Sequence, residues 1–448
     1  MLRSLLLLLA TLLTAAVSTG GTTPCSPLDR AALLAFKAGI TLDTTGILAT
    51  WSGDDCCGGG WEGVSCAATG TGRVVALRLE SQPRRYMEGT LSPSLGDLEF
   101  LEFLVIRDMA RIGGAIPETL SRLARLEQLY LEGNALTGIV PGSMLAKMSS
   151  LRHLSLAGNR LEGTLPPELG SVPGLEQINL AGNRLVGGVP SSYRKLSSKL
   201  AYLDLSNNLF SGIIPEFLGK LKNLLLLDLS NNSFSRPIPA SLGALQNLTD
   251  LSLSRNKIGG RIPPELGGLR SLNSLAIDDN MLTGSIPKPL FTMQNLWRLN
   301  LSRNKLTGPL PDFSDAGVSR SLQWLDVSRN AIGGQIPSSI AELHELERLD
   351  ISRNKVRGVI PAAMATMGNL RWLDISGNAI VGRIPENFSR LAGVRHASFR
   401  GNRLCGQIPQ APPFNRFPAA AYAHNLCLCG KPLPPCRKIG SVSGGLTT

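Results

Sequence analysis

Residues 346–361 read LERLDISRNKVRGVIP, and their spacing of leucine-type residues, asparagine, glycine and proline decides the fold. The same pattern recurs along the chain with a step of mostly 24 residues. Its asparagines are Asn134, Asn159, Asn183, Asn208, Asn232, Asn256, Asn280, Asn304, Asn330, Asn354, Asn378 and Asn402. Many copies of so short a unit predict a solenoid, in which each coil buries its apolar side chains by stacking on its neighbours.

The first half of the quoted stretch has the pattern of a short strand. Leu349 and Ile351 alternate with the polar residues Arg348, Asp350 and Ser352. An alternation of period two indicates a strand with one buried face. We therefore expect residues 349 and 351 to lie in the core, and residues 348, 350 and 352 to face water.

The second half of the stretch carries three residues with special backbone roles. We expect the amide of Asn354 to bond the main chain of its own coil and of the next coil, so that buried peptide groups are satisfied. Gly358 permits a tight bend. Pro361 has no N–H and is expected to end the extended segment that follows. The asparagine column is thus predicted to be structural.

The number of copies sets the size of the predicted surface. Counting the degenerate copies that start near Val74 and Leu101 and the last one at Val394, about fourteen coils are present. Their length lies in the roughly 20–29-residue range of leucine-rich repeats. We therefore expect an α/β solenoid, a curved leucine-rich-repeat superhelix with a parallel β-sheet on its concave face. At about 4.8 Å per strand the face is roughly 60–70 Å long, which suits a macromolecular ligand.

The N-terminus reads as a secretory signal. Arg3 precedes an apolar run at residues 5–17 and small residues at 18–21, and the run is too short for a membrane span. No other stretch approaches the roughly 18–20 apolar residues of a span, and the tail after Cys436 offers no anchor signal. The expected domains are a signal peptide at 1–20, a cap at 21–72, repeats at 73–409, and a C-terminal cap and tail at 410–448. The mature protein is expected to be secreted into the extracellular space or cell wall.

The eight cysteines lie in two terminal clusters, which agrees with secretion. A solenoid exposes its core at both ends, and disulfide-stapled caps close it in an oxidising compartment. Each cluster allows three pairings. A zinc site is disfavoured, because Cys427-x-Cys429 lacks the usual C-x2-C spacing, and we expect no metal or cofactor. The clusters are Cys25, Cys56, Cys57 and Cys66, and Cys405, Cys427, Cys429 and Cys436.

A helix is predicted at the start of the N-terminal cap. Ser26 is expected as its N-cap, with Pro27 at the first helical position and Asp29 completing the capping pattern. One apolar face is expected to seal the first coil, and it consists of Leu33, Phe36 and Ile40.

Four N-x-S/T sequons predict glycosylation on a secretory route. They start at Asn231, Asn247, Asn300 and Asn387. Asn300 falls on the outward face of a predicted strand, so a glycan there would cover part of the concave surface.

Function is expected at the outward strand positions, because the inward positions are committed to packing. Trp324, Arg348 and Trp372 fall in one column and should project side by side about 5 Å apart. Aromatic residues and Arg dominate binding hot spots, although Arg348 could instead form an idle stack with its neighbours. The residues predicted to contact a partner are Tyr202, Arg298, Trp324, Arg348, Trp372, His396 and Arg400.

A neighbouring column of carboxylates is predicted to be a charge ladder rather than a catalytic site. Asp326, Asp350 and Asp374 on adjacent strands repel one another unless cations offset them. Arginines at 329, 348 and 353 are expected to do so. With a net charge of +12, a basic groove would attract acidic pectin or an acidic protein. The alternative is a generally cationic, soluble surface.

The chain resembles the plant extracellular leucine-rich-repeat proteins over essentially its whole mature length. Residues 29–37 (DRAALLAFK), with the later WS, CC and WEGV segments and Cys66, are similar to that family's N-terminal cap. Residues 402–409 (NRLCGQIP) and 424–436 (HNLCLCGKPLPPC) are similar to the C-terminal cap of polygalacturonase-inhibiting proteins and of plant proteins named for DNA-damage toleration. The resemblance implies the disulfides Cys25–Cys56, Cys57–Cys66, Cys405–Cys427 and Cys429–Cys436.

The chain also departs from these relatives. Its array is longer than the roughly ten repeats of the inhibitors, and it is strongly basic. The receptor kinases that share this ectodomain have a kinase and a membrane span, which this sequence lacks, so signalling would need a partner. Some peptide receptors hold a carboxylate with an Arg-x-Arg pair, and the corresponding strand here offers His396, Ser398 and Arg400, which argues mildly against that mode.

These observations favour a secreted binding protein that recognises a protein, peptide or cell-wall ligand through its concave face in plant defence, wall or developmental signalling. Inhibition of microbial polygalacturonases is the alternative, and the expected partners are a polygalacturonase, a membrane receptor kinase or acidic pectin. An enzyme has little support, because the four histidines, at 153, 344, 396 and 424, have no nucleophile or metal ligand at a telling spacing. Nucleic-acid binding is suggested only by charge and by the name of one relative, and secretion argues against it.

Overall fold

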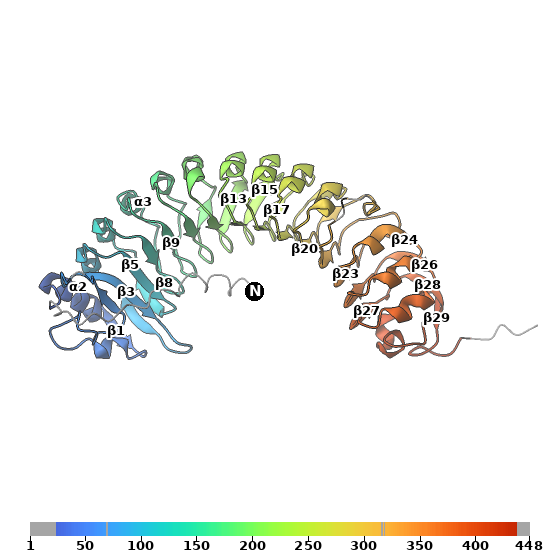
Figure 1. Cartoon of the computed structure of the whole chain (residues 1–448), viewed down its shortest axis with the longest axis horizontal. Coiled ribbons are helices and arrows are strands. Elements are labelled where there is room, and N and C mark those ends of the chain that lie inside the picture. Colours follow the sequence, from blue (N-terminus) through green and yellow to red (C-terminus); the bar gives the residue numbers. More distant parts are fainter. Residues whose placement is uncertain (1–23, 69, 315–316, 318, 437–448) are drawn as a thin grey trace, which may run out of the picture.

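A computed structural model describes residues 24–68, 70–314, 317 and 319–436, and shows a curved solenoid (Figure 1). Strands line the inner side of the arc and short helical turns lie on its outer side. Within the described residues no helix is both long and apolar enough to cross a membrane. The predicted signal peptide at 1–20 lies outside the described residues.

One sheet runs through the whole solenoid. Its first strand is antiparallel to the second, and from β3 onward fourteen parallel strands follow within the described part of the chain, which confirms the predicted fold and coil number. The strands, in spatial order, are β2 (Val64–Cys66), β3 (Val74–Glu80), β5 (Phe103–Arg107), β7 (Gln128–Tyr130), β9 (His153–Ser155), β10 (Gln177–Asn179), β12 (Tyr202–Asp204), β14 (Leu226–Asp228), β16 (Asp250–Ser252), β18 (Ser274–Ala276), β20 (Arg298–Asn300), β22 (Trp324–Asp326), β23 (Arg348–Asp350), β25 (Trp372–Asp374) and β27 (His396–Ser398).

Strand residues divide between the core and the concave face almost as the alternation predicts. Leu349 and Ile351 are fully buried, and the same positions are buried from coil to coil. Asp350 and Ser352, however, are only 8% and 7% exposed, so the expectation that both face water is wrong. Neighbouring strands lie about 4.8 Å apart, and outward side chains of this size cover one another at that spacing.

The asparagine side chains bond the main chain of their own coil and of the preceding coil, but not that of the following coil. Asn354 donates from Nδ2 to the carbonyls of Val327 (3.0 Å) and Ile351 (3.1 Å), and its Oδ1 accepts the N–H of Ile332 (3.0 Å). Val327 and Ile332 belong to the preceding coil, so the predicted bond to the next coil is wrong. Asn425 continues the pattern in the C-terminal cap, where it accepts from the N–H of Leu404.

After the asparagine, many coils add a second, shorter strand that the sequence reading did not predict. Gly358 ends one of them at φ +79°, which fits the predicted bend. These strands form small sheets: β1 (Ile40–Asp43), β4 (Met87–Thr90), β6 (Ala110–Gly114) and β8 (Ala135–Leu136); β11 (Val186–Gly187), β13 (Leu209–Ile213), β15 (Ser233–Arg236) and β17 (Lys257–Ile258); β19 (Thr283–Gly284) and β21 (Lys305–Leu306); and β24 (Arg357–Gly358), β26 (Ala379–Gly382), β28 (Arg403–Gln407) and β29 (Cys427–Cys429).

Short helical turns, mostly 3-10, complete the coils. Pro361 leads directly into one of them, because its fixed φ suits the start of a turn. The 3-10 turns are η1 (Ile47–Thr50), η2 (Pro93–Asp97), η3 (Glu118–Arg122), η4 (Pro167–Ser171), η5 (Ser191–Ser198), η6 (Glu216–Lys220), η7 (Ala240–Ala244), η8 (Pro264–Gly268), η9 (Lys288–Thr292), η10 (Ser338–Glu342), η11 (Ala362–Thr366), η12 (Glu386–Arg390), η13 (Phe414–Arg416) and η14 (Ala419–Ala421). One turn, α3 (Gly142–Leu145), is α-helical.

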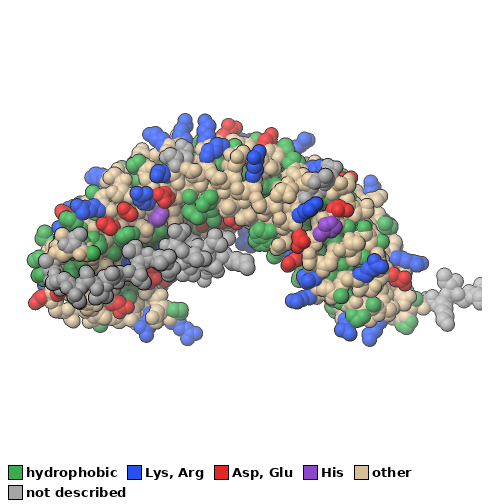
Figure 2. Space-filling view, in the orientation of Figure 1, with side chains coloured by type: hydrophobic (Ala, Val, Ile, Leu, Met, Phe, Trp, Pro, Cys, Tyr) green, Lys and Arg blue, Asp and Glu red, His purple; other side chains and the backbone are tan. Residues whose placement is uncertain are grey.

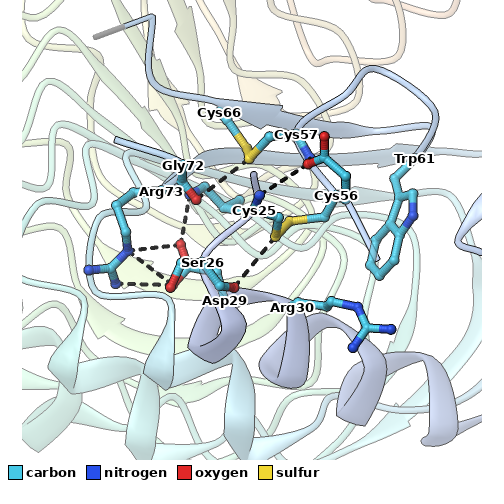
Figure 3. Close-up of a disulfide and its surroundings, with 12 residues drawn as sticks. Cys25, Ser26, Asp29, Arg30, Cys56, Cys57, Trp61, Cys66, Gly72 and Arg73 are labelled. Atoms are coloured by element: carbon cyan, nitrogen blue, oxygen red, sulfur yellow. Dashed lines mark hydrogen bonds and ion pairs between the residues drawn. A yellow bond between two sulfur atoms is a disulfide. The ribbon is translucent and has the colours of Figure 1, made fainter. Parts of the chain in front are cut away.

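The N-terminal cap is built on helix α2 (Pro27–Ala38), which begins after Ser26 as predicted. The predicted capping role of Asp29 is wrong. Its carboxylate is fully buried, pairs with Arg73 at 3.0 Å and accepts the N–H of Val74 at 2.8 Å, so it joins the helix to β3 (Figure 3). Ile40 lies outside the helix, at the start of β1.

Four disulfides hold the two caps. They join Cys25 to Cys56, Cys57 to Cys66, Cys405 to Cys427, and Cys429 to Cys436, the pairs that the resemblance implies (Figure 3 shows the first two). Because Cys427 and Cys429 belong to different disulfides, the Cys427-x-Cys429 pair is not available to a metal. At the same end Phe399 stacks on Tyr422 with 5.6 Å between ring centroids, which plugs the last coil.

Candidate ligand-binding face

Five outward side chains from five neighbouring strands form one row on the concave face. Arg298 of β20 is in register with Trp324 of β22, which is followed by Arg348 of β23, Trp372 of β25 and His396 of β27. The regular repeat places each of them at the first outward position of its strand. We call these five residues the anchor row.

The anchor row is a continuous stack of cations and rings. The guanidinium carbon of Arg348 lies 4.6 Å from the ring centre of Trp324 and 4.3 Å from that of Trp372. Arg298 lies 5.0 Å from the Trp324 ring, and His396 stacks on Trp372 at 3.6 Å with 15° between the planes. The predicted side-by-side arrangement of Trp324, Arg348 and Trp372 is therefore present, and it extends by one residue at each end.

Stacking, rather than hydrogen bonding, holds the row in place. The indole N–H groups of Trp324 and Trp372 and the Nε atoms of Arg298 and Arg348 are buried without a hydrogen-bond partner in the described part of the chain. Buried polar groups without partners cost free energy. The stacking and cation–π contacts contribute stability of their own, which these unpartnered groups partly offset. Rings held in one orientation lose little conformational freedom when a partner binds.

The other two predicted contact residues lie outside the row. Tyr202 is on β12, which is separated from β20 by β14, β16 and β18. Arg400 follows β27, and its Nη2 lies 3.2 Å from Nε2 of His424 in the C-terminal cap. Arg400 is thus near the end of the row, whereas Tyr202 is remote from it.

The column of Asp326, Asp350 and Asp374 lies beside the anchor row. Its carboxylates are partly or fully buried, which the prediction of a surface charge ladder did not include. The pKa of Asp350 is raised to about 6, chiefly by burial; hydrogen bonds from Ser352 oppose the rise, and the charges of Asp326 and Asp374 add to it. Arg348 lies 3.6 Å from Asp350, but Arg329 and Arg353 are exposed residues with left-handed backbone.

The same burial recurs in the middle of the face. It raises the pKa of Asp204 to about 6, and the charge of the neighbouring Asp228 adds to the effect. The pKa of Asp228 is raised as well, again first by burial. The carboxylate column is therefore not the evenly balanced ladder that the sequence predicts.

Replacing Asp350 by asparagine is expected to stabilise the fold at neutral pH. The carboxyl has its usual pKa near 3.8 when unfolded and about 6 when folded, so its contribution to stability is fully present below about pH 4 and is lost as the pH rises to about 6. The variant should gain about 1–2 kcal/mol at pH 7.5 and nothing near pH 3.5. Thermal unfolding at both pH values measures this, and an equal gain at both would contradict it.

A second row, which the sequence reading did not group, lies toward the N-terminus. Arg107 stacks over Tyr130 at 4.2 Å, and the Tyr130 and His153 rings are 6.5 Å apart. Here the polar ends have internal partners: Arg107 pairs with Glu132 at 3.1 Å, and Nε2 of His153 lies 3.7 Å from the Glu176 carboxylate. Burial lowers the pKa of His153. These three residues lie at different outward positions of β5, β7 and β9, so strand register alone does not group them.

Basic residues do not gather in one patch on the face in view. Figure 2 shows Lys and Arg side chains along the whole arc, interspersed with Asp and Glu. The attraction of acidic pectin to the concave face stays a prediction.

The four sequons differ in how their amides are held. The Nδ2 atoms of Asn231, Asn247 and Asn387 donate to Asn207, Lys222 and Ala362, respectively, at 2.9–3.1 Å. Asn300 instead accepts from the N–H and hydroxyl of Ser302. It lies on β20 beside the anchor row, as the sequence predicts, and glycosylation of all four sites stays a prediction.

Comparison with known families identifies the repeats. The leucine rich repeat N-terminal domain family matches residues 26–67. The leucine rich repeat families match residues 124–185, 198–258 and 320–380, and residues 295–315.

Curated relatives match shorter segments. The DNA damage-repair/toleration protein DRT100 of Arabidopsis thaliana is 39% identical over 120 residues, which is 25% of this chain and 32% of the relative. The polygalacturonase inhibitor of Vitis vinifera is 36% identical over 108 residues, 24% of this chain and 30% of the relative. The matches thus span about a third of the length of these relatives.

Solved structures match over more of the chain. The leucine-rich-repeat ectodomain of the Arabidopsis thaliana receptor kinase GASSHO1/SCHENGEN3, in complex with CASPARIAN STRIP INTEGRITY FACTOR 2, is 33% identical with a TM-score of 0.67 and covers 78% of this chain and 47% of its own. The Arabidopsis receptor kinase HAESA, in complex with the peptide hormone IDA and the co-receptor SERK1, is 31% identical with a TM-score of 0.64. The match covers 86% of this chain and 71% of the HAESA chain. The disulfides and these likenesses indicate an extracellular protein. The chain belongs to the plant leucine-rich-repeat proteins.

Proposed function

We propose that this protein is an extracellular binding protein that recognises a polypeptide through its concave sheet, with the anchor row as the principal contact. The observation that carries the proposal is the row itself, in which two tryptophans and two arginines are stacked in fixed orientations without serving the core. The HAESA structure supports it, because that related ectodomain is in complex with a peptide hormone and a co-receptor.

The chemistry of the row indicates what it would bind. Tryptophan and arginine are enriched among hot-spot residues because they offer large contact areas together with N–H donors. The guanidinium groups of Arg298 and Arg348 favour acidic or carbonyl-rich segments of a ligand. We infer a role in plant defence, wall or developmental signalling, with a membrane receptor kinase as partner, in the extracellular space or cell wall. No enzymatic step, cofactor or nucleic acid forms part of this proposal.

Inhibition of a microbial polygalacturonase is the second candidate. Similarity to the grapevine polygalacturonase inhibitor favours it, as does the resemblance of the C-terminal cap. A cap closes the solenoid and need not touch the ligand, so fold and cap likeness alone do not assign this activity. Acidic pectin, the polymer on which such enzymes act, would then be a neighbouring ligand.

The double variant Trp324→Ala, Trp372→Ala is expected to bind its polypeptide partner roughly thirtyfold more weakly, because both rings and the orientation of Arg348 are lost. The first assay is residual activity of a panel of fungal and insect endo-polygalacturonases with the purified glycosylated protein. The second is binding to an array of plant receptor-kinase ectodomains.

A matched control is the double variant Leu226→Ala, Ser274→Ala, which alters the same outward column on β14 and β18. Circular dichroism should show both double variants folded. Undiminished binding by the tryptophan variant, or its failure to fold, would overturn the assignment of the anchor row. Inhibition of a polygalacturonase that depends on the two tryptophans would select the second candidate.

A further inference from the structure

An open depression of about 470 Å³ lies beside the anchor row, on the edge of the concave face where β20 and β22 begin. It is lined by Trp297, Arg320, Ser321, Gln323 and Glu345. None of these residues belongs to the anchor row or was a predicted contact. We call this depression the side pocket.

The repeat holds the lining residues in place. Trp297 and Gln323 each precede a strand by one residue, and the carbonyl of Trp297 accepts the N–H of Gln323 at 2.9 Å, so the two side chains come from adjacent coils. Ser321 donates from its hydroxyl to the carbonyl of Gln294 at 2.6 Å. Glu345 accepts from Nδ2 of Asn369 at 3.3 Å.

Packing does not require a tryptophan at this position. In the two preceding and three following coils the equivalent residues are polar, namely Thr249, Asn273, Gln323, Glu347 and Arg371, whereas Ala201 and Leu225 occupy this position nearer the N-terminus. Trp297 is only half-buried, and Arg320, Gln323 and Glu345 are exposed. A large apolar ring therefore lies between coils that have polar residues at this position, at the edge of the depression and among exposed polar groups.

We propose that the side pocket binds a neutral sugar ring of an oligosaccharide. One face of a pyranose is a patch of C–H bonds, which fits the flat apolar surface of an indole. Its hydroxyls lie around the ring edge and both donate and accept, and the Gln323 amide, the Glu345 carboxylate and the Ser321 hydroxyl between them offer both functions.

Charge favours an uncharged ring. Arg320 and Glu345 carry opposite charges on the same rim, so neither a uronate nor an amino sugar is preferred overall. An aromatic side chain of a peptide would also fit the indole, but it would leave the surrounding polar groups without partners, which costs free energy. The inference goes beyond the proposed polypeptide recognition and does not depend on it.

The test is titration of the full glycosylated chain with cellotetraose. Calorimetry and saturation-transfer NMR measure the binding. Trigalacturonic acid serves as the charged comparison. We expect saturable binding of cellotetraose that Trp297→Ala weakens roughly tenfold or more. Gln323→Ala removes an exposed side chain and should weaken binding severalfold without affecting folding. Leu225→Ala, at the equivalent position before β14, is the matched control and should bind like the unmodified protein.

Three results would overturn the proposal: no binding of cellotetraose by the folded protein, unchanged affinity in Trp297→Ala and Gln323→Ala, or binding of trigalacturonic acid alone. Because no polypeptide is present in this titration, its outcome is separate from that of the anchor-row assays. Loss of polypeptide binding in the Trp324/Trp372 variant with normal cellotetraose binding would support both sites independently.

Discussion

Replacing Asp29 by alanine is expected to lower the free energy of unfolding of the N-terminal cap by about 3 kcal/mol. The carboxylate is fully buried, and it satisfies both the Arg73 guanidinium and the main-chain N–H of Val74. Without it, the largely buried Arg73 guanidinium loses its ion pair and the Val74 N–H loses its acceptor, and only the Phe100 ring still faces the cation. Hydrogen exchange over residues 27–38 and 74–80, with thermal unfolding of the whole chain, measures the loss.

Asp54 provides the matched control. It pairs with Arg30 at 2.7 Å, but its side chain is 96% exposed, so the pair is screened by water and contributes little. Asp54→Ala should therefore leave both measurements within experimental error. Equal losses in the two variants would show that net charge, rather than burial of the Asp29 carboxylate, controls the cap.

Asn183→Ala is expected to cost about 3 kcal/mol and to loosen two adjacent coils. The side chain is buried, its Oδ1 accepts the N–H of Leu161, and its Nδ2 donates to the carbonyls of Leu156 and Leu180 at 3.0 and 3.1 Å. Alanine would leave the buried N–H of Leu161 without a partner, and the carbonyls of Leu156 and Leu180 would each lose one of two amide donors, keeping Asn159 and Asn208 respectively. Urea unfolding and hydrogen exchange at Leu161 are the measurements.

The control for this variant lies four residues earlier. Asn179 is only half-buried and accepts one hydrogen bond, from the N–H of Ala181 within its own turn. Asn179→Ala is expected to change stability by less than about 1 kcal/mol. If the two alanine variants unfold at the same urea concentration, the asparagine column does not carry the coil-to-coil stability assigned to it.

Much of the fold is predictable because the same pattern of strand, asparagine, glycine and proline residues recurs in many coils. The alternation at Leu349 and Ile351 predicts the strand, and Gly358 predicts the bend that its φ of +79° confirms. The second strand is harder to predict. It is often only two residues long, as in Arg357–Gly358, and so short a segment shows no periodicity of its own.

The side-chain partners were less predictable than the backbone. Asp29 has the spacing of a capping residue, yet it bonds Arg73, which lies 44 positions away, and no local pattern encodes that contact. Asp350 has an outward position, but its burial depends on the size of its neighbours.

In the anchor row, the repeat spacing correctly predicted that Trp324, Arg348 and Trp372 are neighbours. Strand register alone determines which side chains lie side by side. The side pocket was not predicted, since Trp297 lies just outside the strand. Its hollow depends on Arg320 and Glu345, which come from the turns of other coils.

The direction of the asparagine bonds has a consequence for how the chain matures as it is synthesised. The Leu161 N–H obtains its partner only when Asn183, 22 residues later, has been made and has folded back. From Leu136 onward, each turn of the growing polypeptide is therefore completed only when the next turn has folded onto it. The final turn is finished by Asn425, which accepts the Leu404 N–H. A ribosome that stops early would release a chain whose last turn always lacks its closing amide.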